Sequence, residues 1–228
     1  MDFSLILPSR ERPNLLRGFL ESVRSTADHP ERLEVIVATD DDDAATQEVT
    51  PVLSEVFPFV TFWTRDRADN LHIGYYNPMA VEMASGRYVW VLNDDAVVVT
   101  PHWDTLALAH FELCPVDGLW YGHGPDSLKQ HFGMFPLLPM QAVQALGYVL
   151  HPGFRAWGAD ENLYDIWHNV GRVFYCPMLR TDHLAHHHGT RERDGVNMRM
   201  GHLSKESNIN APTEMAKEEA ARIRKLIA

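Results

Sequence analysis

The sequence has little cysteine, little positive charge and no long apolar run. Because Cys114 and Cys176 are the only cysteines among 228 residues, a disulfide framework is not expected. The expected location is therefore a reducing compartment, the cytoplasm. No apolar run approaches the roughly 18–20 residues of a membrane-spanning helix, and the opening Met-Asp-Phe lacks the layout of a signal peptide. The 20 Lys and Arg face 31 Asp and Glu, a net charge of −11 that argues against a protein gripping nucleic acid by its phosphates.

The first half of the sequence, in contrast, is regular. Short runs of β-branched and aromatic residues alternate there with stretches whose apolar residues recur at helical spacing. Strands are predicted at residues 4–7, 33–38, 59–63 and 88–92, and helices at 13–25 and 77–84. The alternation predicts an α/β fold whose mostly parallel sheet is built from right-handed crossovers. In such sheets, ligands bind beyond the carboxyl ends of the strands.

Acidic residues directly follow two of these predicted strands. Residues 40–43 are all Asp, and Asn93, Asp94 and Asp95 come after the strand at 88–92. Adjacent carboxylates raise each other's pKa unless a cation neutralises them, and Mg²⁺ or Mn²⁺ bridging to a phosphate is a natural partner. Both clusters also have a simpler interpretation, because Asn and Asp are common in turns and Asp is favoured at helix N-termini. Neither cluster alone decides between the two.

The second half is less regular and rich in histidine, with eleven of the 13 His after residue 100. Its predicted elements are a loop at 122–133, a strand at 132–138, a helix at 139–147, a helix at 158–170, a strand at 172–176, a loop at 184–207 and an amphipathic helix at 213–228. Asp160 and Glu161 begin a helix, where acids are favoured, but either could be a general base. His183 and the run 186–188 could supply a metal ligand or be ordinary polar loop.

These motifs, in this order, resemble family 2 glycosyltransferases, which have the GT-A fold. The resemblance rests on SLILPSRERP at 4–13, EVIVATD at 34–40, YNPMA at 76–80, ASGRY at 84–88, NDD at 93–95 and, further on, on Asp160, Leu163, Gly171, Pro177 and His183. The NDD motif falls where the family keeps its Asp-x-Asp metal motif. The resemblance implies a Rossmann-like, mostly parallel sheet flanked by helices, with a C-terminal loop and helix as an extension.

The resemblance also implies a reaction. A single sugar would pass from a nucleotide diphosphate sugar to an acceptor hydroxyl, with inversion and with Mn²⁺ or Mg²⁺ as cofactor. The implied donor-nucleotide residues are Pro8, Ser9, Arg12, Asp40, Asn77 and Asp94. The implied metal ligands are Asp95, Asp94 and His183, with His186 as a substitute. Asp160 would be the general base, and Glu161 could stand in for the Glu that the family often has at position 159.

The resemblance further divides the chain. Residues 1–208 would form the GT-A domain, with a nucleotide-sugar-binding half at 1–100 and an acceptor-binding half at 101–208. Residues 209–228 would be a C-terminal amphipathic helix. Without a long C-terminal membrane helix, processive synthesis of a polymer through a membrane is not expected.

Three positions depart from the family pattern and keep other functions open. Asn93 replaces the first acid of the metal motif, Ala159 stands where the family often has Glu, and Ile166 replaces a usual Arg. A catalytically silent module that binds nucleotide sugars is therefore one alternative. A sugar-phosphate nucleotidyltransferase is another, although residues 8–13 lack the glycines of that class's loop.

The sequence leaves open the acceptor, the donor base and sugar, and the oligomeric state. Aromatic residues that could stack on a sugar, or simply fill the core, are Trp120, Tyr121, His123, Phe135, Trp157 and Trp167. The net charge counts against a nucleic-acid acceptor. A possible basic strip still leaves that acceptor open; its members are Arg172, Arg180, Arg191, Arg193 and Arg199.

Overall fold

A computed structural model describes residues 1–67, 74–126, 133–155, 158–184, 192, 194–196, 198 and 212–228 of the chain. The strands are β1 (Phe3–Ser9), β2 (Leu33–Asp40), β3 (Val60–Arg65), β4 (Tyr88–Val91), β5 (Ala96–Val98), β6 (Tyr121–His123), β7 (Leu137–Pro139), β8 (Val173–Tyr175) and β9 (Thr181–His183). The helices are α1 (Pro13–Thr26), α2 (Ala44–Val56), α3 (Tyr76–Pro78), α4 (Trp103–Phe111), α5 (Met140–Leu146), α6 (Ala159–Val170) and α8 (Pro212–Ile227). A 3-10 turn (Pro30–Arg32) precedes β2, and a π-helical turn (Met79–Met83) extends α3.

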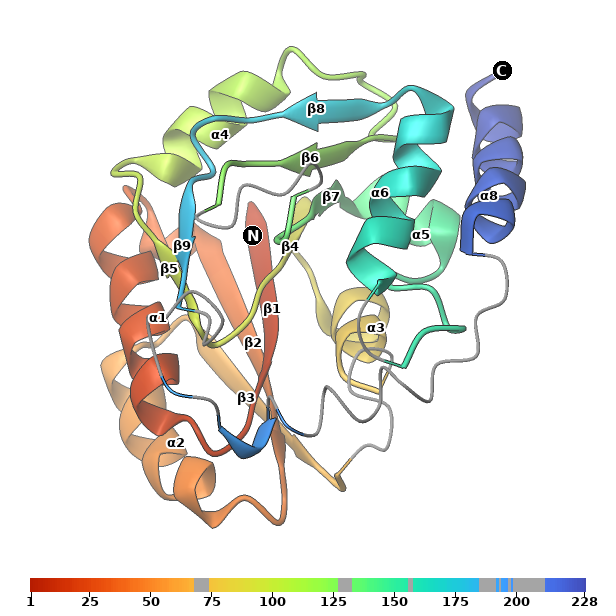
Figure 1. Cartoon of the computed structure of the whole chain (residues 1–228). Helices are drawn as coiled ribbons and strands as arrows, with labels where there is room; N and C mark the ends of the chain where they lie inside the picture. Colours follow the sequence, from red (N-terminus) through yellow and green to blue (C-terminus); the bar gives the residue numbers. More distant parts are fainter. Residues whose placement is uncertain are drawn as a thin grey trace.

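Seven strands form one twisted sheet in the order β3-β2-β1-β4-β7-β6-β8 (Figure 1). The first four are parallel, with Phe3 opposite both Leu33 and Tyr88, while β7 runs antiparallel to β4 and β6. A second, two-stranded sheet joins β5 and β9 antiparallel. The α/β fold and its mostly parallel sheet are therefore as the sequence predicts.

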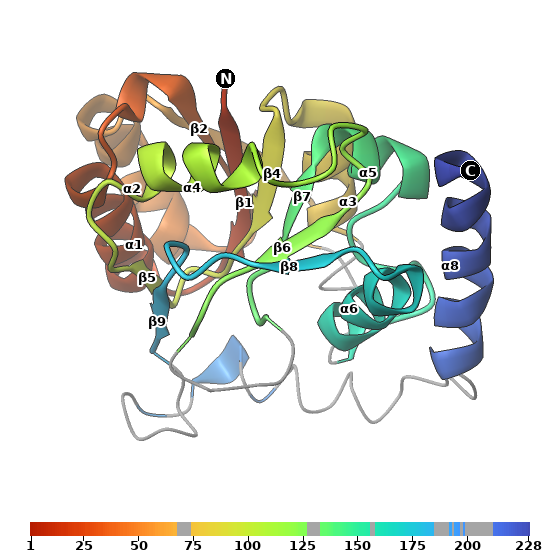
Figure 2. The same cartoon turned by 90° about the horizontal axis from the view of Figure 1, so that it is seen from above.

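Helices cover both faces of the sheet, as the view in Figure 2 also shows. Successive residues of a strand point to opposite faces, so β1 supplies both cores. Leu5 and Leu7 pack in the core that includes α1, α2 and α4. Ile6 packs in the core that includes α3, α5, α6 and α8. The carboxyl ends of β1, β2 and β4 consequently emerge together at one edge, between the two helical layers.

Several short elements were not predicted. The sequence analysis missed β5, β9 and α4, and the loop expected from residue 122 starts inside β6. Of the strand expected at 132–138, the structure forms only β7 within the described residues. Strands of three residues are too short to show the alternation by which a strand is recognised. Their pairing partners also lie far away in the chain, so no local turn marks them. Most of the loop predicted at 184–207 lies outside the described residues.

The C-terminal helix α8 packs on α5 and α6 at the side of the molecule (Figure 1). Ala216, Ala220 and Ile223 are fully buried there, whereas Leu226 is 56% exposed. Arg222 donates to the carbonyl of Ala145 at 2.6 Å. Within the described residues, none of the helices has the length and apolar composition that crossing a bilayer requires.

Candidate active site

The site lies where β1 and β4 end side by side. Ser9 is the last residue of β1, and Asp94 and Asp95 follow β4 after Leu92 and Asn93. The Ser9 hydroxyl donates to Asp94 Oδ2 at 2.9 Å, and both residues are buried. Parallel pairing of β1 with β4 thus brings the acidic motif against the turn that follows β1.

Arg12 lies between the acids of this site. Its Nη1 donates to Asp94 Oδ1 at 2.9 Å and lies 3.7 Å from Asp95 Oδ2. On its other side, Nε and Nη2 form a two-pronged ion pair with Asp194, at 2.7 and 2.9 Å. Only 9% of the Arg12 side chain is exposed, so these carboxylates surround it. Asp194 was not singled out in the sequence, because nothing local marks a residue 182 positions away as the partner of Arg12.

Asp95 is joined to the second small sheet. His183 Nε2 lies 3.1 Å from Asp95 Oδ1, and the amide of Leu184 donates to the Asp95 carbonyl at 2.8 Å. The pairing of Ala96 with His183 fixes this approach, and the ring of Phe135 packs 5.2 Å from that of His183. The structure therefore brings together the predicted residues Asp95 and His183. His186, the substitute ligand, lies outside the described residues.

Burial shapes the electrostatics of this acidic pair. Burial and, less strongly, the charge of Asp95 raise the pKa of Asp94 to about 6, against the attraction of Arg12. The pKa of Tyr76 is also raised, first by burial and then by Asp94, Asp95 and Asp160. The Tyr76 hydroxyl donates to the Leu92 carbonyl and to Asn93 Oδ1.

Asp95 and His183 are candidate metal ligands. Among the described residues, no group of three or more His, Cys, Asp and Glu side chains is arranged to hold a metal ion. Asp95 and His183 nonetheless form a pair of adjacent oxygen and nitrogen donors. Mg²⁺ commonly takes one or two protein carboxylates and completes its shell with substrate phosphates and water. The donor set therefore fits a metal that arrives with a phosphorylated ligand, rather than one held by protein alone.

The four consecutive Asp residues that begin at the end of β2 have different roles. Asp40, only 3% exposed, accepts hydrogen bonds from the Tyr75 hydroxyl and from Arg10 Nη1, the latter at 2.9 Å. Arg10 also pairs with the exposed Asp42. Asp43 caps α2, accepting from the amides of Thr46 and, at 2.8 Å, Glu11. Asp40 is thus a buried carboxylate at the carboxyl end of β2, and Asp43 serves the structural role that helix ends favour.

Asp160 and Glu161 begin α6 after Gly158, whose φ of 91° requires the left-handed conformation. Asp160 is half-buried and Glu161 is exposed. Burial raises the pKa of Asp160, although the amide of Glu161 donates to its carboxylate at 3.0 Å. A carboxylate with a raised pKa is a stronger base, which suits a residue that removes a proton.

The remaining predicted residues are placed less directly at the site. Pro8 is half-buried beside Ser9. The amide of Asn77 is engaged by backbone, with Oδ1 accepting from Val149 and Leu150 at 3.0 Å each and Nδ2 donating to the Leu150 carbonyl at 2.8 Å. Asn77 thus ties α3 to the segment that leads toward α6.

The aromatic residues considered for stacking also divide. The core-filling alternative holds for four of them, which are buried in the two cores: Trp120, Tyr121, Phe135 and Trp167. Trp157 lies outside the described residues. His123 is half-buried at the end of β6 and keeps part of its surface accessible.

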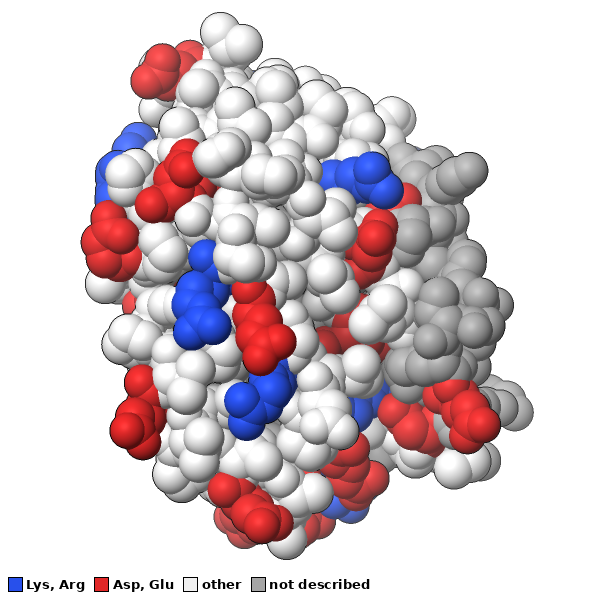
Figure 3. Space-filling model, turned by 90° about the vertical axis from the view of Figure 1, so that its left-hand side faces the viewer, with Lys and Arg blue, Asp and Glu red and all other residues white. Residues whose placement is uncertain are grey.

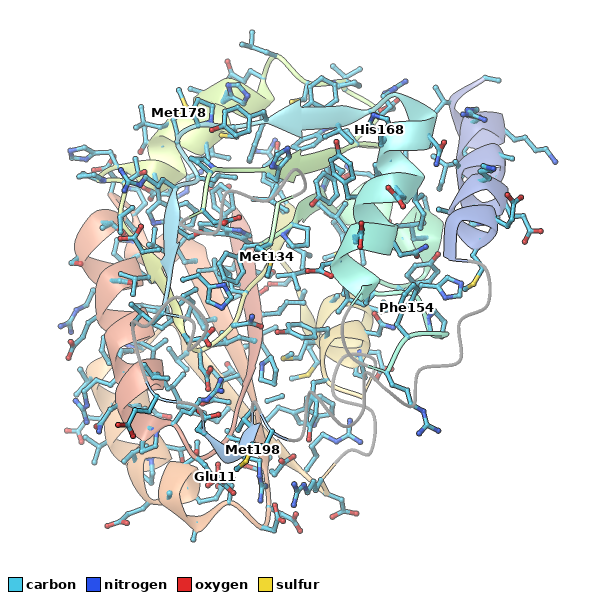
Figure 4. The ribbon with its side chains drawn as sticks, viewed as in Figure 1. Glu11, Met134, Phe154, His168, Met178 and Met198 are labelled. Carbon is cyan, nitrogen blue, oxygen red and sulfur yellow. The ribbon has the colours of Figure 1, made fainter. Side chains whose placement is uncertain are left out.

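Figure 4 shows the surroundings of this edge. Glu11 and Met198 lie together below the end of β1, in agreement with the close approach of Gly195 to Glu11. On the face that carries α1 and α2, acidic and basic side chains are interspersed (Figure 3).

Comparison with known proteins agrees with this arrangement. The profile described as glycosyl transferase family 2 matches residues 4–186. No curated protein matches the sequence. The structure resembles a mannosyltransferase, PcManGT from Pyrobaculum calidifontis in complex with GDP-Man and Mn²⁺, with a TM-score of 0.63 and 16% identity over 97% of this chain and 73% of the other.

Two further structures are similar. GalNAc-T7 with UDP, GalNAc and Mn²⁺ matches with a TM-score of 0.62 and 15% identity over 80% of this chain, which spans only 43% of that protein. Residues 1–349 of S. aureus TarS in complex with UDP-GlcNAc match with a TM-score of 0.63 and 11% identity, over 98% of this chain and 71% of the other. At such identities these likenesses are of fold.

Proposed function

The chain belongs to glycosyl transferase family 2 and is a glycosyltransferase, and we propose that it moves one sugar, in a metal-dependent and inverting reaction, from a nucleoside diphosphate sugar to an acceptor hydroxyl. The observation that carries the proposal is the meeting of Asp94, Asp95 and His183 at one edge of the sheet, where His183 Nε2 lies 3.1 Å from Asp95 Oδ1 and Arg12 bonds Asp94. The family membership supplies the reaction class, and these side chains supply groups for binding the donor.

Donor binding is assigned to the ends of β1 and β2. Asp40, held by Tyr75 and Arg10, offers carboxylate oxygens to the N–H or O–H groups of a base or ribose. Pro8 and Ser9 line the neighbouring strand end, and Asn77 supports the segment opposite. Arg12 is the fixed cation of the site, and we assign it to the diphosphate because guanidinium groups match phosphate oxygens.

Asp95 and His183 would hold a Mn²⁺ or Mg²⁺ ion, with Asp94 beside them. When bound, such an ion neutralises the negative charge that develops on the departing diphosphate. Asp94 keeps Arg12 in place from one side while Asp194 does so from the other. The two acids hold the Arg12 guanidinium in a fixed position, so that it and the bound ion would together face the charge that develops on the leaving group.

Asp160 is proposed to accept the proton of the acceptor hydroxyl. The acceptor oxygen then forms a bond to the anomeric carbon as the bond to the diphosphate oxygen breaks, so the configuration inverts. The raised pKa of Asp160 strengthens the carboxylate as a base. The neighbouring Glu161 is exposed, and we assign it only the role of a substitute base.

The catalytically silent module is the second candidate, and Asn93 motivated it. In the structure Asn93 Oδ1 accepts a hydrogen bond from Tyr76, so this residue is engaged in orienting a buried phenol. The functional carboxylates of the motif are then Asp94 and Asp95.

Cys114 and Cys176 are buried free thiols, in keeping with the reducing cytoplasm in which we propose that the enzyme works.

The proposal is tested by incubating the protein with a panel of UDP- and GDP-sugars and Mn²⁺ and measuring released nucleoside diphosphate. We expect slow donor hydrolysis that is lost with EDTA and in Asp95→Ala, while Asp41→Ala, a change at an exposed carboxylate nearby, keeps it. Binding of UDP or GDP without turnover, unaffected by Asp160→Ala, would favour the silent module. Release of pyrophosphate from a nucleoside triphosphate would instead indicate a nucleotidyltransferase.

A further inference from the structure

One face of α6 carries three polar or aromatic side chains in line. Asp160, Tyr164 and His168 are spaced by four residues, so they follow one another up the same side of the helix. The rings of Tyr164 and His168 stack, with centroids 5.5 Å apart and planes 21° apart. The proposed base is therefore the first member of a row that continues away from the reacting edge, toward the end of α6 where Figure 4 labels His168.

The edge of the sheet presents rings to this row. Tyr121 and His123 lie on the same face of β6, since they are two residues apart, and His123 is paired with Tyr175 of the edge strand β8. The centroid of Tyr164 lies 5.9 Å from Tyr121 and 6.2 Å from His123, both edge-on. His123 and Tyr175 are 5.4 Å apart. We define the aromatic strip as His123, Tyr164, His168 and Tyr175.

The members of the aromatic strip are accessible, unlike the tryptophans of the core. Tyr175 is 53% exposed, His168 is exposed, and His123 and Tyr164 are half-buried. Burial lowers the pKa of His123, so its ring is neutral at pH 7. Packing of the core does not require aromatic rings at the surface. Because these rings adjoin the carboxylate of Asp160, the aromatic strip is a candidate binding site.

We propose that the aromatic strip is the acceptor subsite and that it takes a pyranose sugar, whose attacking hydroxyl reaches Asp160 while its ring lies against Tyr164. This inference rests on the proposed function. One helical turn advances about 5.4 Å, close to the length of one sugar ring, so a ring at Tyr164 leaves its end hydroxyl at Asp160. Beyond Tyr164 the strip continues to His168 along α6, and to His123 and Tyr175 across β6 and β8.

The chemistry of the strip favours a sugar over the other acceptors. The negative face of an aromatic ring attracts the C–H groups of a pyranose face, and imidazole and phenol edges can hydrogen-bond its hydroxyls. Nucleic acid needs cations against its phosphates, whereas the strip contains neither Lys nor Arg and has the acids Asp160 and Glu161 beside it on α6. The nearby Arg172 is paired with Asp117 at 3.0 Å.

The test measures saccharide binding without any donor turnover. Disaccharides of glucose, galactose, mannose and N-acetylglucosamine are titrated into isotope-labelled protein held with UDP or GDP and Mg²⁺, and the histidine C–H signals are followed by NMR. We expect at least one disaccharide to shift His123 and His168. Tyr175→Ala and Tyr164→Leu should weaken its binding about tenfold, and Tyr164→Phe, which keeps the ring, should not. His29→Ala, at an exposed histidine elsewhere, is the matched control.

The outcomes separate the two proposals. A protein that hydrolyses donor yet binds no saccharide, or binds one equally well in Tyr175→Ala and His168→Ala, overturns this inference and leaves the proposed function standing. A protein that binds saccharide at the strip but hydrolyses no donor overturns the proposed function alone. Comparing methyl and octyl glycosides of the best sugar, below the micelle concentration, then distinguishes a free or protein-linked glycan from a lipid-linked one, which the octyl chain mimics.

Discussion

Asp94→Asn should stabilise the protein at neutral pH while it removes activity. Asp94 is 3% exposed, and its pKa is raised from 3.8 to about 6, mainly by burial. The folded state therefore holds this proton more tightly than the unfolded state does, so stability falls as pH rises from about 4 to 6 and stays low above. Two pKa units correspond to roughly 3 kcal/mol that the ionised group costs the fold at pH 7.

An asparagine removes that cost with little change of shape. Its amide oxygen can accept from Arg12 while its amide nitrogen donates to the Ser9 hydroxyl, and Arg12 retains Asp194 and Asp95 as partners. For a chain of this size, 1 kcal/mol moves Tm by about 2–4 °C, so we expect Tm to rise by roughly 6–12 °C at pH 7.5. Such a gain from losing a site residue is typical of active sites, where function is placed ahead of stability.

The measurement is thermal unfolding in EDTA across pH 4.5 to 8. The difference between Asp94→Asn and the wild type should be small at the acid end and full above about pH 6.5. Asp41→Asn, at an exposed carboxylate, should show no such trend. Mn²⁺ added with UDP or GDP should then stabilise the wild type more than the variant. If Asp94→Asn unfolds at the same or a lower temperature at pH 7.5, the ionised Asp94 is not a cost to the fold and the reasoning is wrong.

Three further changes have definite expected results. In Gly86→Ala the new methyl would lie 2.6 Å from the amide nitrogen of Ser4, so chemical denaturation should show a loss of about 2–4 kcal/mol. Arg12→Gln should weaken UDP or GDP binding at least tenfold by calorimetry, with a smaller loss in Asp194→Asn, and equal binding in all three proteins would remove Arg12 from the donor site. Asp160→Asn should lower transfer by about 10²–10⁴ with donor binding intact, and the wild-type rate should fall on the acid side at a pH above the ordinary range of Asp, because the pKa of Asp160 is raised. A rate independent of pH on that side would contradict the role of Asp160.

Much of the first half of the chain could be predicted from the sequence, and for a local reason. The apolar runs that form β1, β2 and β4 are continuous in the chain, and a residue proposed for the site ends or closely follows each of them: Ser9, Asp40 or Asp94. Because parallel strands joined by helical crossovers place their carboxyl ends at one edge, the order of these runs already indicates where the acids meet. The role of Asp43 as a helix cap also agrees with a local rule, because Asp is favoured at helix N-termini.

Only the tertiary structure decided the rest, because those contacts join residues that no periodicity connects. The pairing of two three-residue strands that lie far apart in the chain, β5 and β9, brings His183 to Asp95. The ion pair of Arg12 with Asp194 spans 182 positions. The aromatic strip arises from the packing of α6 on β6 and β8, and its histidines are indistinguishable in the sequence from ordinary surface ones. Local pattern determined the sheet and its acids, and the long-range packing of short elements decided which side chains those acids meet.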